Sequence, residues 1–288
     1  MVSEACRQLL LESQRYSAKF GGGMFNHLPM ALVALDRLGG DEARLRAFAA
    51  VYAKQLRPKT KKEIALRERF REIPRLDAGV ESQAFHCVIR LAYAVDSGVA
   101  EEIPDAMSAW MWSAPAVPAR RRHGRRTPQE AFAAIANDDR FPRTFDGRSI
   151  SGRLAKVMAL PAFAEYECTG PLPDLALISA KIYASTGDFT ALHMLTGCHA
   201  MRVLTPHLGP DALGIFATAL LAAYVAIGRP PIVERDLDNL PSNEALAARA
   251  IVSNDDHDLK IVYSALQEEG EYRSGYHRLA AAVRLLSS

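Results

Sequence analysis

The sequence of 288 residues predicts an all-α fold, organised as a single multi-helix bundle. Apolar residues recur at helical spacing along most of the chain, whereas runs of alternating β-branched residues are nearly absent. Glycine follows several of the apolar runs, as at Gly39, Gly98 and Gly187, where the C-terminus of a helix favours it. The helical spacing of the apolar residues and the glycines that follow them therefore both predict helices.

In chain order, we expect helices at 3–19, 26–38, 41–55, 80–96, 104–113, 128–137, 150–159, 174–186, 189–205, 210–227, 243–253, 255–269 and 274–287. The run Thr127–Glu130 reads as a capping box with proline at the first helical position, so it starts the helix at 128. Asn26, Asp188 and Asp255 are candidate N-caps. Residues 220–224 are apolar on nearly all faces, which predicts a central helix at 210–227. The remaining stop signals are Gly40, Gly209 and Gly270.

Two basic stretches read as linkers. Residues 57–62 form a basic connection, and residues 115–126 hold five arginines around His123. An arginine cluster can bind anions or nucleic acid, but no aromatic residues interleave here, which favours a solvated loop. Neither stretch borders a shift in composition. We therefore expect residues 1–288 to form one domain.

Composition excludes several classes of protein. Hydrophobic residues make up 49% and charged residues 24%, ordinary values for a globular chain. A formal net charge of +2 argues against a general nucleic-acid binder. The start of the chain has no apolar stretch of signal length, and the longest apolar run, 212–228, is interrupted by Gly214 and Thr218. We expect a cytoplasmic protein without nucleic-acid or membrane partners, and the oligomeric state stays open.

The four cysteines are far apart and form no C-x-x-C pair. That spacing argues against a disulfide framework and against a structural zinc ribbon. We expect buried free thiols that pack as small apolar residues.

Histidines lie near the starts of predicted helices. His27, His86 and His257 each begin a segment of about three helical turns that ends in glycine. His193 follows the candidate cap at Asp188. The positive end of a helix dipole disfavours imidazolium, and neutral imidazole is the form that binds a metal. Each histidine alone is better explained as a partly buried residue, but together they predict a histidine-rich metal site in the bundle interior.

Lys260 stands three residues after His257, so both side chains project from one helix face. An ammonium group has no lone pair and cannot ligate a metal. Lys260 could ligate if burial deprotonated it or if it became a carbamate. An ion pair with Asp256 at i−4 is the alternative that spacing favours.

At these residues the sequence resembles the questin oxidase-like family. The similar stretches are 25–39, 84–94, 192–202 and 255–260. The resemblance implies an oxygenase that opens or oxidises polycyclic aromatic polyketides, with a mononuclear non-haem Fe(II) held by histidines and a modified, carboxylated lysine. The ligands that it implies are His27, His86, His193, His257 and Lys260.

His199 lies six residues after His193, about 120° away around a regular helix, so both could face one metal only if Gly197 marks a bulge. We therefore place His199 behind the ligands or in the pocket wall. Arg90 and Arg202 could hold a phenolate or carboxylate, or pair with acidic neighbours. The candidate catalytic residues are thus His199, Arg90, Arg202 and Asp256. Candidate wall residues, each also explicable as core, are Phe85, Tyr93, Trp110, Trp112 and Phe189.

Three functions remain open. The first is an Fe(II)-dependent oxygenase that brings dioxygen to a hydroxylated aromatic or quinone-type small molecule. The second is a zinc- or manganese-dependent hydrolase or lyase in the same pocket, which the absence of an H-E-x-x-H motif disfavours. The third is a non-enzymatic helical scaffold, disfavoured because no constant repeat of thirty to fifty residues is present. We expect His123, His207 and His277 to be surface or structural residues.

Overall fold

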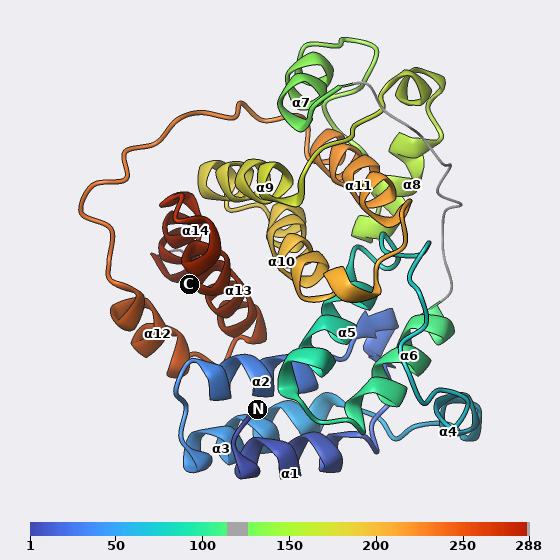
Figure 1. The fold of residues 1–288 in the computed structure, drawn as a ribbon, viewed down its shortest axis with the longest axis vertical. Helices are drawn as coiled ribbons and strands as arrows, with labels where there is room; N and C mark the ends of the chain where they lie inside the picture. Colours follow the sequence, from blue (N-terminus) through green and yellow to red (C-terminus); the bar gives the residue numbers. More distant parts are fainter. Residues whose placement is uncertain (114–125, 287–288) are drawn as a thin grey trace.

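The computed structural model describes residues 1–113 and 126–286, and it confirms the all-α class. Figure 1 shows the helices gathered around α10. The α-helices are α1 (Glu4–Ser13), α2 (Leu28–Arg37), α3 (Glu42–Tyr52), α4 (Lys61–Arg67), α5 (His86–Ser97), α6 (Glu102–Ser113), α7 (Pro128–Ala136), α8 (Ile150–Met158), α9 (Leu172–Thr186), α10 (Phe189–Val203), α11 (Ala212–Ala226), α12 (Asn243–Ile251), α13 (Asp256–Tyr272) and α14 (Tyr276–Leu286). Short 3-10 helices cover Gly21–Gly23, Ala53–Gln55, Pro161–Glu165 and Thr205–His207.

The central helix is α10. It packs against α5, α9, α11 and α13, and every residue from 190 to 201 is buried. The helix predicted to be central, α11, is also buried along most of its length, but it packs toward α7 and α8. The sequence did not identify α10 as the central helix. The buried residues of α10 include histidines and threonines, so the helix is less apolar than a buried helix usually is.

The predicted linker at 57–62 is wrong at its C-terminal end, because α4 begins at Lys61. Thr60 and Glu63 form a capping box, in which each side chain binds the backbone of the other residue. Glu63 is buried and also accepts a hydrogen bond from the Ser17 hydroxyl at 2.5 Å. Because residues 57–62 are mostly basic, they were predicted to form a linker and the capping box was not predicted. The capping box expected at Thr127 is present and starts α7.

Three other boundaries differ from the predictions. The helix expected at 3–19 ends at Ser13, and the chain then forms a small antiparallel hairpin of β1 (Lys19–Phe20) and β2 (Met24–Phe25). The helix expected at 80–96 begins only at His86. Gly270 does not stop α13, which continues to Tyr272 and ends at Arg273 in the left-handed region, with φ of 50°.

The substitution Arg273→Gly is expected to stabilise the protein by about 0.5–1 kcal/mol. Arg273 is exposed, and its Cβ is strained in a left-handed conformation that glycine adopts freely. Chemical unfolding in urea measures the gain, and Arg273→Ala is the control because it keeps the Cβ. An equal gain from alanine, or no gain from glycine, would contradict this explanation.

The cysteines Cys6, Cys87, Cys168 and Cys198 are free and buried, as predicted. Within the described ranges, no helix combines the length and the apolar character needed to cross a membrane. The arginine-rich stretch with His123 lies almost wholly outside the described residues, as does the side chain of Trp112.

Candidate metal centre

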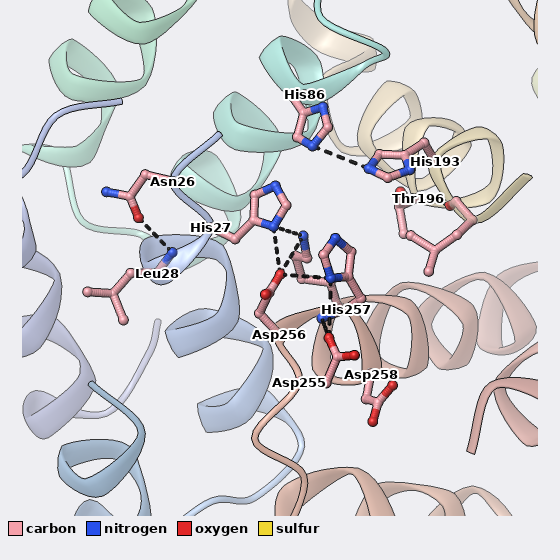
Figure 2. Close-up of polar contacts among 12 residues, drawn as sticks. Asn26, His27, Leu28, His86, His193, Thr196, Asp255, Asp256, His257 and Asp258 are labelled. Atoms are coloured by element: carbon pink, nitrogen blue, oxygen red, sulfur yellow. Dashed lines mark hydrogen bonds and ion pairs between the residues drawn. The ribbon is translucent and has the colours of Figure 1, made fainter. Parts of the chain in front are cut away.

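Four histidines from four separate helix segments lie together in the interior. His27 immediately precedes α2, His86 is the first residue of α5, His193 lies in α10 and His257 is the second residue of α13. The ring centroids are 4.9 Å apart for His27 and His86, and 4.6 Å for His86 and His193. They are 4.9 Å apart for His27 and His257, and 6.0 Å for His193 and His257. Figure 2 shows the four side chains facing one another.

A left-handed turn places His86. Gln83, Ala84 and Phe85 all have positive φ, between 53° and 69°, which costs about 1–2 kcal/mol for each residue with a Cβ. The turn brings the Gln83 carbonyl to 2.5 Å from His86 Nδ1. A Cβ at Gly197 of α10 would meet the Phe85 Cβ at 3.3 Å, so this glycine lets α10 pack closely against the turn. Strain of this kind is typical of functional sites.

The hydrogen bonds of His86 and His193 leave two lone pairs facing each other. His86 Nδ1 contacts the Gln83 carbonyl, and His193 Nδ1 contacts the Phe189 carbonyl at 2.7 Å. A carbonyl only accepts, so each Nδ1 carries the proton and each Nε2 has a lone pair. The two Nε2 atoms are 3.2 Å apart. Two nitrogens bound at about 2.1 Å to one metal ion have a similar separation, so the pair fits a cation.

His27 and His257 repeat this pattern with carboxylates. His27 Nδ1 lies 2.6 Å from Asp256 Oδ2, and His257 Nδ1 lies 3.2 Å from Asp255 Oδ1. The Nε2 atoms of both rings are buried, and neither has a hydrogen-bond partner among the residues that the structure describes. A buried polar atom without a partner requires an explanation, and a metal ion supplies one. Metal-binding histidines commonly donate their other N–H to a carboxylate or a backbone carbonyl.

The cluster has two halves. The ligand atoms offered by His27, Asp256 and His257 all lie within 4.8 Å of one another. His86 and His193 form the other half, joined to the first by the stacking of His86 on His27. His86 and His193 are not part of that group of ligand atoms, so coordination of one ion by all four imidazoles requires a change in the orientation of the rings.

Lys260 lies behind His27. Its Nζ is 3.0 Å from Asp256 Oδ2 and 2.7 Å from His27 Nδ1, so it makes the ion pair that spacing favoured. Burial lowers the pKa of Lys260, and the neighbouring Asp256 opposes that effect. Burial alone would raise the pKa of Asp256, but the Lys260 charge and the hydrogen bond from His27 hold it well below its usual range.

The stability of the apoprotein is expected to fall steeply as the pH drops below about 6.5. Burial, followed by the charge of Lys260, lowers the pKa of His27 from 6.5 to about 4. Between pH 6.5 and about 4, His27 binds a proton in the unfolded chain but stays neutral in the folded chain. Lowering the pH through this range therefore favours unfolding. For His27 alone the loss is about 3 kcal/mol. Urea unfolding of metal-free protein at a series of pH values measures this loss.

The same histidine provides the control. His27→Gln should make the pH dependence less steep across this range, because it removes one of the four titrating imidazoles. An unchanged slope would show that His27 is not the source. The other three imidazoles act in the same direction, since burial also lowers the pKa of His86, His193 and His257.

His199 faces away from this cluster. Because α10 continues without a bulge, His199 lies on another face of the helix, where its Nδ1 is 2.7 Å from Glu268 Oε1. Arg202 Nε binds the same oxygen at 2.8 Å. Arg90 is buried and pairs with Glu102 and Asp105. Both arginines thus make the acidic pairs that the sequence left open, and no contact joins them to the four imidazoles among the described residues.

Two phenyl rings flank the cluster. Phe25 stacks on His86 with centroids 5.2 Å apart. Phe189 contacts His193 and His257 edge-on, at 4.8 Å in each case, and is 48% exposed. Of the other candidate wall residues, Phe85 packs on Phe216, Tyr93 lies near His199, and Trp110 is buried.

Sequence reasoning missed several partners of the imidazoles. Phe25 had only its place two residues before His27 as a signal, and Asp255 was noted only as a cap. The carbonyls of Gln83 and Phe189 left no signal, because every residue has a backbone carbonyl.

These features define an all-α protein with a buried cluster of imidazoles whose pKa values are lowered by burial. Neutral imidazole is a ligand for transition metals. A family model described as Questin oxidase-like matches residues 70–265, more than half of the chain, so the chain belongs to the questin oxidase-like family. The match includes His86, His193, His257 and Lys260, while His27 precedes it. Membership associates the chain with oxidoreductases. No curated protein matches the chain.

Proposed function

We propose that this protein is an Fe(II)-dependent oxygenase acting on a hydroxylated aromatic or quinone-type small molecule. The proposed ligands are His27, His86, His193 and His257. The observation that carries the proposal is the shared arrangement in which each Nδ1 lies within hydrogen-bond distance of an oxygen acceptor. Among the described residues, the Nε2 atoms of His86 and His193 lie 3.2 Å apart, and those of His27 and His257 are buried without a hydrogen-bond partner. Family membership supports oxidation of an aromatic polyketide as the reaction.

The residues of the chain have distinct roles in this proposal. When bound, the iron supplies the one-electron chemistry that joins dioxygen to an aromatic substrate. With Lys260 as the neutral amine, Asp256 accepts the proton of His27 Nδ1, so that Nε2 is free to ligate. Phe25 and Phe189 keep water from the imidazoles, and the exposed side of Phe189 offers a surface for an aromatic ring.

Lys260 is proposed as a conditional ligand. Burial lowers its pKa and so favours the neutral amine, which is the form that reacts with carbon dioxide to give a carbamate. The carbamate would replace a cation by an oxygen ligand close to His27. Intact mass spectrometry in bicarbonate buffer tests for the added carboxylate, with Lys260→Met as the control.

The test of the function is anaerobic loading with Fe(II), followed by elemental analysis and by measurement of oxygen uptake with hydroxylated anthraquinones. We expect bound iron and substrate-dependent oxygen uptake. His207→Gln is a suitable control, because His207 lies in the 3-10 helix after α10 and outside the cluster. Protein that binds no iron contradicts the proposal. Turnover of substrate by zinc- or manganese-loaded protein without oxygen would favour the hydrolase or lyase instead.

A further inference from the structure

An ion-pair network connects the last helix to the imidazole of His257. Arg284 of α14 binds Asp255 Oδ2 through Nη2 at 2.6 Å. Its Nε donates to Asp258, whose other oxygen accepts from the Ser253 hydroxyl at 2.6 Å. The same hydroxyl accepts a hydrogen bond from the Asp255 backbone N–H at 3.1 Å.

Asp255 is the member that touches the metal centre. Its Oδ1 accepts from the His257 backbone N–H at 2.8 Å, which caps α13, and lies 3.2 Å from His257 Nδ1. The Asp255 side chain is 45% exposed, so in the absence of other contacts it would exchange its bonds with water. Arg284 holds its second oxygen, and the guanidinium is itself held by buried Asp258. A planar guanidinium can bind two carboxylates at once, which a lysine ammonium does less precisely.

We propose that Arg284 is a positioning residue of the metal centre: it holds Asp255, and Asp255 orients the imidazole of His257. This inference rests on the proposed function, since it requires that His257 binds a metal. It makes the C-terminal helix α14 part of the site, although no residue of α14 lies among the proposed ligands.

The test measures the affinity of the purified full chain for Co(II). Binding is monitored through the visible absorption of the bound ion. Asp255→Asn preserves the cap, because asparagine caps helices as well as aspartate does, but it removes the anionic acceptor. We expect a loss of affinity of about 10- to 100-fold. Arg284→Gln should lose about tenfold, and Arg284→Lys should recover part of that loss. The double variant should bind no more weakly than Asp255→Asn, because both changes act through one contact.

The matched control is Arg249→Gln. Arg249 of α12 likewise binds α14, through a 2.6 Å bond to the Leu285 carbonyl, and among the described residues it makes no hydrogen bond or ion pair with Asp255. It should bind Co(II) with wild-type affinity. Wild-type affinity in Arg284→Gln would overturn the inference, and so would losses that multiply fully in the double variant. Arg284→Lys keeps the test decisive if the glutamine variant does not fold. Wild-type protein that binds neither Co(II) nor Fe(II) would instead overturn the metal centre itself.

Discussion

Replacing His193 with alanine is expected to lower the affinity for Fe(II) or Co(II) by more than about 100-fold and to leave the helical fold intact. His193 is almost fully buried, and its Nε2 faces that of His86. Loss of a direct ligand exceeds the 10- to 100-fold that loss of an outer partner costs. The side chain makes no ion pair within the described part of the chain, so circular dichroism should report a folded variant. Metal titration and elemental analysis measure the loss.

His199→Gln is the matched control for this experiment. His199 lies on the same helix and is equally buried, but it binds Glu268. This variant should lose stability and keep the metal. If His199→Gln released the ion as fully as His193→Ala, the assignment of the two faces of α10 would be wrong. A His193→Ala protein with wild-type affinity would exclude His193 as a ligand.

The second large effect is expected on stability. Arg90→Met should destabilise the protein by about 3–5 kcal/mol, because it leaves the Glu102 carboxylate buried without its cation. Burial already raises the pKa of Glu102, against the opposing charge of Arg90. Urea unfolding at neutral pH measures this loss. It separates an ion-pair role from the role of a substrate anchor, which the sequence also allowed for Arg90.

A second substitution tests the cause. Arg90→Met combined with Glu102→Gln should recover part of the lost stability, because the neutral amide needs no cation and can keep its bond to Gln14. If the double variant were as unstable as the sum of the single variants, the buried charge would not be the reason. An Arg90→Met protein of unchanged stability that needed more substrate for saturation would favour the anchor role.

Local signals account for the elements that the sequence predicted correctly. The Thr127 capping box and the caps at Asp188 and Asp255 involve residues within one helical turn. Such local features can therefore be predicted from the sequence alone. Two local features were not predicted from the sequence: the left-handed turn before His86 and the capping box at Thr60. The turn before His86 is left-handed in spite of its cost, and α10 packs closely against it at Gly197. The residues of the Thr60 capping box are present in the sequence, but the neighbouring lysines led to the prediction of a basic linker there.

By itself, the sequence determined the helical class and singled out the four histidines, because helical period, caps and residue type are local properties. Only the tertiary structure decided which ring nitrogen of each histidine faces an oxygen acceptor. The acceptors that hold each Nδ1 are two carbonyls and two carboxylates, and the His27 ring depends on Asp256, which is 229 residues away. The same holds for Arg90 and Arg202, whose acidic partners lie 12 and 66 residues distant. Long-range packing brings such groups together, and no periodic pattern in the chain records it.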